Sequence, residues 1–416
     1  MDQPAGGDTP APTTTRRDTT LLAVGSLLNG LLAYVFFALV TRSLGAGPAA
    51  PVAVLWAWWS FAGAAITFPV QHWISRTAAL DVGEAAVRRG LPRVAAAVTG
   101  ASVTAGAVAW LARERLFGPD GGWFPLLVVG IGLGSGVVGL VRGTLSGRHQ
   151  FVALGICLVL ENGLRCVVTG FLIISGSESP TAYGAALVVG AAAVLLWPTA
   201  LVPRRSGAGG LGTPLAFVSG ASAGQLLAQV TLTGGPVLLA AVGGAPAQVT
   251  ALFAALALFR APYTVALGLV AALTGRLTRM VEAGQHAALR RLREGLIVAT
   301  LVTAGLGGLG AAWLGPKVME LVFGDGVRLD RGTTALVAIG SVFALATLVL
   351  TVGLLARGRS VAVARTWLAA VPFGVVAYLL VPGSELTRTC WTFVVVEVVA
   401  WLGFLLLEWR SDRRDP

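Results

Sequence analysis

Four ionisable side chains interrupt apolar runs that are long enough to cross a membrane. Glu161 and Arg165 lie four residues apart in the stretch LENGLRC, and Arg260 and Glu397 lie in two later runs. Residues four apart share one face of a helix, so Glu161 and Arg165 can neutralise each other. Because a charge at the centre of a membrane helix costs about 2.5 to 3.5 kcal/mol, these side chains should face other helices or a wet cavity.

Two interpretations of these charges are open from the sequence. Either Glu161 and Arg165 form an ion pair that clips one helix to its neighbours, or they line a cavity. Arg260 has no carboxylate three or four residues away, so it either pairs with Glu397 or lines the cavity as well. In a cavity, the planar guanidinium groups of Arg165 and Arg260 suit the oxygens of an anionic ligand. Glu161 and Glu397 are then the carboxylates available for coupling to H⁺ or Na⁺.

Three uncharged polar residues are weaker candidates for binding: Asn29 in the first apolar run, and Gln225 and Gln229 in a later one. Gln225 and Gln229 share a helix face, and Pro236 follows on the same helix, where uncovered carbonyls could bind a sugar hydroxyl or a cation. Alternatively, these side chains form hydrogen bonds between helices, each of which stabilises the protein by less than ~1 kcal/mol.

The composition identifies a polytopic membrane protein. Of the 416 residues, 56% are apolar and only 12% are charged, and the mean hydropathy is +0.80. Windows of about 20 residues without charge can each span a hydrocarbon core of ~30 Å. The net charge of +11 is expected of Arg-rich cytoplasmic loops, so we predict no nucleic-acid partner. No HExxH, GxSxG, CxxC or Walker A sequence occurs, so we predict neither an enzyme nor a cofactor.

We predict twelve spans and an orientation from the positions of the charges. Of the thirty Lys and Arg residues, twenty-one fall on the side of the two termini and seven on the other side. This bias predicts a multi-pass protein of the inner (cytoplasmic) membrane with both termini in the cytoplasm. The predicted spans are about 20–43, 50–73, 92–112, 123–145, 151–175, 181–202, 213–241, 247–273, 294–315, 333–356, 361–381 and 387–408.

The two halves of the chain resemble each other after a shift of 195 residues. The shift aligns Gly25 with Gly220, Leu31–Ala33 with Leu226–Ala228, and Ala50–Pro51 with Ala245–Pro246. We therefore expect six-helix bundles at residues 19–205 and 206–409, between a disordered cytoplasmic tail, 1–18, and a short C-terminal tail, 410–416. Six is an even number, so a pseudo-twofold axis along the membrane normal should relate the bundles, with a cavity between them.

Several short motifs cover most of the chain. They are VTRSLGAGPAAPVAVLWA after the first span, LVRGTLSGRHQFVALGICLVLENGLRCVV around the fourth and fifth, ALFRAPYTVALGLVAALTGRLTRMVEAGQHAALRRL in and after the eighth, and VMELVFGDGV before the tenth. These motifs resemble the polysaccharide-exporter branch, the O-antigen and teichoic-type flippases, of the multidrug/oligosaccharidyl-lipid/polysaccharide (MOP) flippase superfamily. Ala50 or Pro51 stands where that family commonly has Gly.

The resemblance implies an all-α fold with two six-helix bundles (MATE/MOP-like) and a flippase. Such a protein moves a polyprenyl-diphosphate-linked oligosaccharide to the outer leaflet by alternating access. Arg165, Arg260 and the cytoplasmic Arg142 would receive the diphosphate. The implied partners are this substrate, membrane lipids, and a glycan polymerase and glycosyltransferases.

Two rival functions are open. A cation-coupled multidrug antiporter of the same superfamily would require an acidic cavity, with Glu161 or Glu397 unpaired. A non-transporting scaffold of a glycan synthesis complex would have a cavity that is closed or filled by large side chains.

Overall fold

The computed structural model describes residues 16–78, 83–119, 121–204, 225–266, 277, 280–281, 283–356 and 359–412. Within these residues all regular structure is helical. The elements are α1 (Arg16–Leu44), α2 (Ala50–Ala62), the π-helical η1 (Gly63–Thr67), α3 (Phe68–Ala78), α4 (Gly83–Leu111), α5 (Arg113–Phe117), α6 (Phe124–Gly147), α7 (Phe151–Ile174), α8 (Pro180–Val189), the 3₁₀-helical η2 (Gly190–Leu196), α9 (Pro198–Leu201), α11 (Gly235–Ala241), α12 (Pro246–Phe259), α14 (His286–Phe323), α15 (Arg331–Ala356), α16 (Ser360–Leu380) and α17 (Glu385–Asp412).

Nine helices of the described part are long and apolar enough to cross a membrane, which agrees with nine of the twelve predicted spans. The other three predicted spans do not appear as single long helices within the described residues. Span 181–202 is divided into α8, η2 and α9. Span 213–241 begins outside the described residues and breaks between the helical residues 225–233 and α11, and span 247–273 leaves the described part after residue 266.

The repeat seen in the sequence coincides with the starts of two helices. Ala50 and Pro51 open α2, and Ala245 and Pro246 open α12, with proline in the first turn of each. The preceding helices differ, because α1 is continuous whereas its counterpart breaks at Gly234. The run Gly234, Gly235 and Pro236 accounts for the break, since proline has no amide hydrogen to continue a helix.

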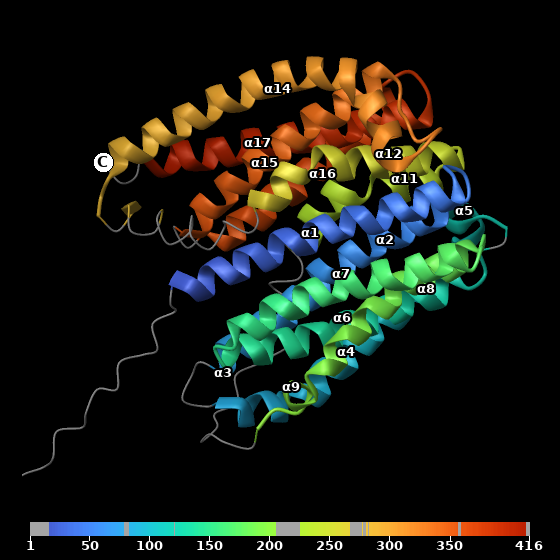
Figure 1. Ribbon diagram of the computed structural model, residues 1–416. Helices are drawn as coiled ribbons and strands as arrows, with labels where there is room; N and C mark the ends of the chain where they lie inside the picture. Colours follow the sequence, from blue (N-terminus) through green and yellow to red (C-terminus); the bar gives the residue numbers. More distant parts are fainter. Residues whose placement is uncertain are drawn as a thin grey trace, which may run out of the picture.

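The described helices form two groups, which we call the N bundle (α1–α9) and the C bundle (residues 225–233, α11, α12 and α14–α17) (Figure 1). Contacts between the groups join α1 to α14, α2 to α11 and α12, and α5 to α11. The predicted division between residues 205 and 206 lies outside the described residues. In Figure 1 the start of α1 and the end of α17 lie at the left, and α5 lies at the opposite end. We call these the termini end and the far end.

The two bundles share one hydrophobic core at the far end. This core contains the last turns of α1, the first turns of α2 and α12, and the end of α14. Toward the termini end, the remaining clusters of buried apolar residues each belong to a single bundle. Within the described part, the bundles are therefore held together at the far end.

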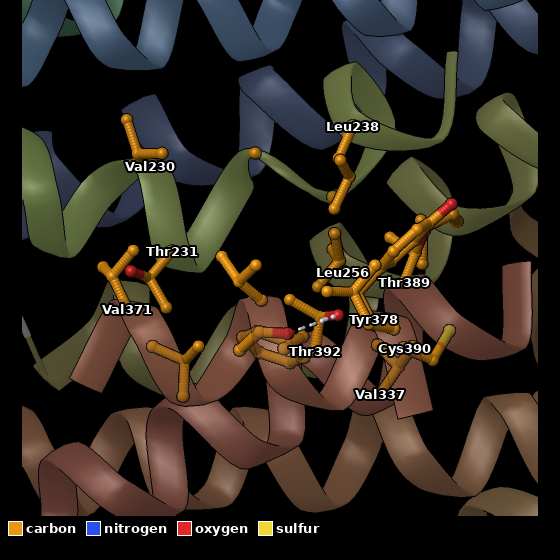
Figure 2. A pocket seen from close by; sticks show the side chains of 18 residues that line it. Val230, Thr231, Leu238, Leu256, Val337, Val371, Tyr378, Thr389, Cys390 and Thr392 are labelled. Atoms are coloured by element: carbon orange, nitrogen blue, oxygen red, sulfur yellow. Dashed lines mark hydrogen bonds between the residues drawn. The ribbon is translucent and has the colours of Figure 1, made fainter. Parts of the chain in front are cut away.

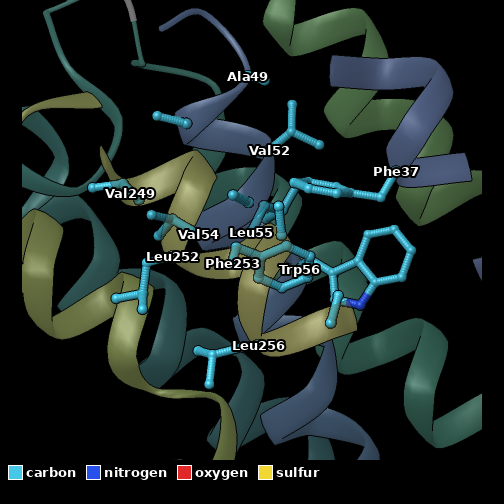
Figure 3. Close-up of a cluster of buried hydrophobic side chains, with 14 of the residues drawn as sticks. Phe37, Ala49, Val52, Val54, Leu55, Trp56, Val249, Leu252, Phe253 and Leu256 are labelled. Atoms are coloured by element: carbon cyan, nitrogen blue, oxygen red, sulfur yellow. The ribbon is translucent and has the colours of Figure 1, made fainter. Parts of the chain in front are cut away.

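Aromatic rings form the centre of the shared core (Figure 3). The ring of Phe37 from the N bundle lies 4.5 Å, centroid to centroid, from the ring of Phe253 in the C bundle, and 5.8 Å from that of Phe323. Trp56 of α2 lies 5.7 Å from Phe253. Phe37, Phe253 and Phe323 are buried, as is Trp56, so these rings leave no solvent-filled gap between the bundles at this level.

Candidate functional site

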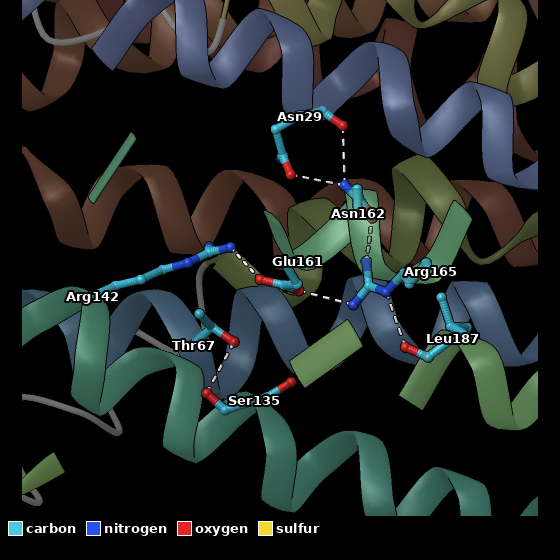
Figure 4. Close-up of polar contacts among 8 residues, drawn as sticks. All are labelled: Asn29, Thr67, Ser135, Arg142, Glu161, Asn162, Arg165 and Leu187. Carbon is cyan, nitrogen blue, oxygen red and sulfur yellow. Dashed lines mark hydrogen bonds and ion pairs between the residues drawn. The ribbon is translucent and has the colours of Figure 1, made fainter. Parts of the chain in front are cut away.

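A buried ionic cluster lies inside the N bundle (Figure 4). Glu161 of α7 accepts hydrogen bonds from two arginines, with Arg165 Nη2 at 2.8 Å from Oε1 and Arg142 Nη2 on Oε2. The predicted pairing of Glu161 with Arg165 is confirmed. Arg142, expected as a cytoplasmic residue, instead lies within α6 and is buried. One carboxylate between two guanidinium groups leaves the cluster with an excess positive charge.

Arg165 is enclosed on all sides. Its Nε donates to the carbonyl oxygen of Leu187 at 2.9 Å, its Nη1 to Asn162 Oδ1 at 2.5 Å, and its Nη2 to Glu161. The guanidinium carbon lies 4.5 Å from the centroid of the Trp59 ring, a cation–π contact. A side chain at Gly190 would bring its Cβ to 2.3 Å from Arg165 Nε. All three nitrogens are therefore bonded to protein oxygens in this conformation.

Asn29 joins the same cluster through Asn162. Asn162 Nδ2 donates to the backbone oxygen of Asn29 at 3.0 Å and to its Oδ1 at 2.8 Å. The helices α1 and α7 approach closely here, because Gly25 faces Gly155 with no side chain between them. Three predicted site residues, Asn29, Arg142 and Arg165, thus meet around Glu161.

Arg260 and Glu397 of the C bundle make no ion pair with each other in the described part of the chain. Arg260 follows α12 as its C-cap, and its Nη1 is buried without a hydrogen-bond partner among the described residues. Glu397 is 1% exposed, and its Oε2 is likewise without a described partner. The ion pair by which these two residues would hold two helices together is not observed among the described residues.

Arg260 lies at the interface between the bundles. It lies close to Tyr34 of α1 and to Tyr263 of its own bundle. The Tyr34 hydroxyl donates to the carbonyl oxygen of Ala257 at 2.6 Å, which ties α1 to the end of α12. Tyr263 also interacts with Glu397. Arg260 is therefore a buried cation that lies close to α1 of the other bundle.

The two predicted glutamines lie on the helical residues 225–233. Gln225 is exposed, and Gln229 Nε2 donates to Thr233 Oγ1 at 3.3 Å on its own helix. The break at Gly234 borders a cavity of 390 Å³ within the C bundle (Figure 2). Thr231, Thr389 and Thr392 line this cavity, but neither glutamine does. The structure does not bring Gln225 or Gln229 to the cluster around Glu161.

Four residues of these sites were not singled out in the sequence: Asn162, Trp59, Tyr34 and Tyr263. Asn162 could have been found, because it lies in LENGLRC three residues before Arg165 and so near the same helix face. The other three are aromatic residues in apolar runs. Their types alone are typical of ordinary packing, and only the tertiary contacts distinguish them.

No protein-family model matches the chain, and no curated protein matches it in sequence. Solved structures do match its fold. A MOP superfamily transporter from Pyrococcus furiosus, described as having a binding pocket of reverse polarity that suggests a different function, aligns over 96% of this chain and 98% of its own, with 15% identity and a TM-score of 0.61.

Two further structures are similar over almost the whole chain. The inward-facing conformation of a multidrug resistance MATE family transporter of the MOP superfamily covers 97% of this chain and 96% of its own, with 16% identity and a TM-score of 0.58. The eukaryotic MATE transporter AtDTX14 covers 96% and 97%, with 14% identity and a TM-score of 0.58. The chain therefore has the fold of the MATE transporters of the MOP superfamily.

Proposed function

We propose that this protein is a transporter of the MOP superfamily, and that it flips a polyprenyl-diphosphate-linked oligosaccharide across the cytoplasmic membrane. The fold supports the first part, since the chain matches MATE transporters from end to end. The second part rests on the charge of the interface between the bundles. It is carried by one observation, the cationic Arg260, whose buried Nη1 has no hydrogen-bond partner among the described residues.

The buried carboxylates bear on the choice between an anionic substrate and a cationic drug, and Glu397, which has no ionic partner among the described residues, meets the condition stated above for the cation-coupled antiporter. Among the described residues, the buried carboxylates are Glu161, Glu397 and Glu408. Glu161 is neutralised by two arginines, and Glu397 lies inside the C bundle. Glu408 lies near the end of α17, at the termini end. The cation at the interface, Arg260, suits a diphosphate, whose oxygens match the donors of a guanidinium.

The transport cycle would be alternating access, and the described conformation would be the one closed on the outside. The bias of basic residues toward the side of the termini supports a cytoplasmic termini end. The shared core then seals the outer end, and on the cytoplasmic side the described residues form no core common to both bundles. A substrate could enter from the inner leaflet and leave after the bundles rock about their interface.

Some of the site residues would contact the substrate, and the others would hold the helices of the N bundle in place. Arg260 would contact the diphosphate. Gln225 and Gln229 would form hydrogen bonds with sugar hydroxyls. Arg142, Arg165 and Asn29 would keep the N bundle rigid, and Arg165 could reach a phosphate only after leaving its present partners. Glu397 is proposed as the coupling carboxyl for H⁺ or Na⁺, since it is buried and its Oε2 has no hydrogen-bond partner among the described residues. Membrane lipids, a glycan polymerase and glycosyltransferases complete the proposed partners.

A reconstitution experiment tests this function. Purified protein in liposomes is given undecaprenyl-diphosphate-linked glucosamine that carries a fluorophore, and an impermeant reductant quenches the probe in the outer leaflet. We expect the wild type to raise the quenched fraction above that of empty liposomes, and Arg260→Ala to reduce the rate at least about tenfold, as for loss of a charged contact.

Arg328→Ala is the matched control, because Arg328 is exposed and pairs with Glu320 at the far end. Wild-type rates in Arg260→Ala would reject the diphosphate site. Transport of a cationic dye such as ethidium, without movement of the lipid probe, would support the multidrug antiporter. Movement of neither compound would support the scaffold.

A further inference from the structure

A second apolar cavity, of 720 Å³, lies between the two bundles. Its walls come from α2 and η1, from α4 and from α6 in the N bundle, and Leu226 and Val230 of the C bundle contribute the opposite side. Because both bundles build it, its shape must change when they move relative to each other. It therefore belongs to the moving part of the molecule.

The lining of this cavity contains no charged residue. Its polar side-chain atoms are Ser102 Oγ, which donates to Val98 O at 2.7 Å, and Trp58 Nε1, which has no partner among the described residues. Small side chains of α4 form one wall, and Trp58 and Phe61, with ring centroids 5.9 Å apart, form another. This surface suits a flexible hydrocarbon chain and offers nothing to an ion or a sugar.

Residue counts along the helices place Arg260 near the level of one part of the cavity wall. Ala65 of the cavity wall follows the start of α2 by fifteen residues, and Arg260 follows the start of α12 by fourteen. Both helices start at the far end, and at the rise of an α-helix these counts correspond to about 22.5 Å and about 21 Å along the two helices. A lipid of the bilayer keeps its phosphate at the membrane surface. A lipid whose diphosphate binds Arg260 would place its hydrocarbon chain between the two bundles, close to the level of this cavity.

We propose that this cavity binds the isoprenoid chain of the lipid-linked substrate while the diphosphate contacts Arg260. The proposal rests on the flippase function proposed above and adds a separate subsite to it. The rim residues Ala97, Ala101 and Val230 are exposed, so the rest of a long chain can continue into the bilayer. Trp59, next to Trp58 on α2, lies on Arg165, so the wall of the cavity is fixed to the ionic cluster of the N bundle.

The test compares two probes that have the same fluorescent glucosamine diphosphate but carry either an undecaprenyl chain or a five-carbon dimethylallyl chain, which is too short to fill the cavity. Ala105→Phe fills the cavity from α4, and Ala101→Trp narrows its rim at a more exposed position. Ala107→Phe is the control, since Ala107 is exposed on the same helix and does not line the cavity. We expect both cavity variants to slow flipping of the undecaprenyl probe about tenfold, with the dimethylallyl probe and the control unchanged.

The outcomes separate this subsite from the transport function. A wild type that flips neither probe rejects both proposals. A wild type that flips the probes, with cavity variants that slow both tails equally or slow neither, rejects the isoprenoid site alone. The Ala105→Phe variant could instead lose phospholipid that co-purifies with the wild type and slow both probes equally. That result would assign the cavity to a bilayer lipid and would also reject the proposal.

Discussion

Arg42 donates its Nε to the carbonyl oxygen of Val322 at 3.1 Å, and so joins the last turn of α1 to the last turn of α14 in the other bundle. Its Nη2 donates to the carbonyl oxygen of Leu321. The last carbonyls of a helix have no partner within the helix and carry partial negative charge. A cation from the N bundle therefore caps a helix of the C bundle, beside the aromatic core at the far end.

Arg42→Ala should loosen the closed far end. Because Arg42 is exposed, its hydrogen bonds contribute only about 1 kcal/mol, which corresponds to a roughly fivefold shift in population. The measurement is the labelling rate of a cysteine at Ala251, buried in the shared core, with an impermeant maleimide in a background without the three native cysteines. Arg113→Ala is the control, since Arg113 donates to Trp110 within its own bundle. Equal labelling in all variants would contradict this role for Arg42.

Glu161→Gln should be the most damaging single change in the ionic cluster. It leaves two buried guanidinium groups without their carboxylate, and breaking a buried ion pair costs about 3 to 5 kcal/mol. Thermal unfolding in detergent should therefore begin at a markedly lower temperature. Arg142→Gln should cost less than Arg165→Gln, because Arg165 also bonds Asn162 and Leu187. Unchanged thermal stability in Glu161→Gln would show that the cluster does not hold the N bundle together.

Gly190→Ala should displace Arg165. The added Cβ would lie 2.3 Å from Arg165 Nε and 2.9 Å from the carbonyl oxygen of Glu161, and overpacking of this kind costs about 1 to 3 kcal/mol. Gly163→Ala on α7 is a matched control, since nothing lies within 4 Å of its added Cβ, and replacing a helical glycine there should stabilise the protein by about 0.5 to 1 kcal/mol. Melting temperatures that move in the same direction for both variants would argue against this packing.

Glu397→Gln should abolish coupling of transport to a proton gradient without lowering the thermal stability of the protein. The carboxyl is buried with one oxygen unpartnered in the described part, so a neutral amide of the same shape should leave the melting temperature unchanged or raise it. If Glu397 exchanges protons during the cycle, flipping of the undecaprenyl probe should no longer respond to an imposed pH gradient. A full response to the gradient in Glu397→Gln would exclude this residue as the coupling group.

Local spacing predicted some features of the structure and tertiary packing decided the others. The i, i+4 spacing of Glu161 and Arg165 fixes their pairing within one helix. The contact of Glu161 with its second partner, Arg142, depends on how α6 packs against α7. The spacing of residues in the sequence does not determine this packing. Pairing of Arg260 with Glu397 was one of the two interpretations open from the sequence, and the described structure does not join these residues. The break at Gly234 was foreseeable from its glycines and proline, but not its position beside a cavity.

The uneven sharing of charge between the bundles has a consequence for biosynthesis. The N bundle leaves the ribosome first and holds its own counter-charges, so it can complete its ionic cluster before the second half is made. The C bundle brings Arg260 and Glu397 into the membrane without ionic partners among the described residues, at about 2.5 to 3.5 kcal/mol for each charge at a helix centre. Arg260 meets Tyr34 only when the first half is already in place. Synthesised without its N-terminal half, the C-terminal half should insert poorly, and supplying that half as a separate polypeptide should rescue it.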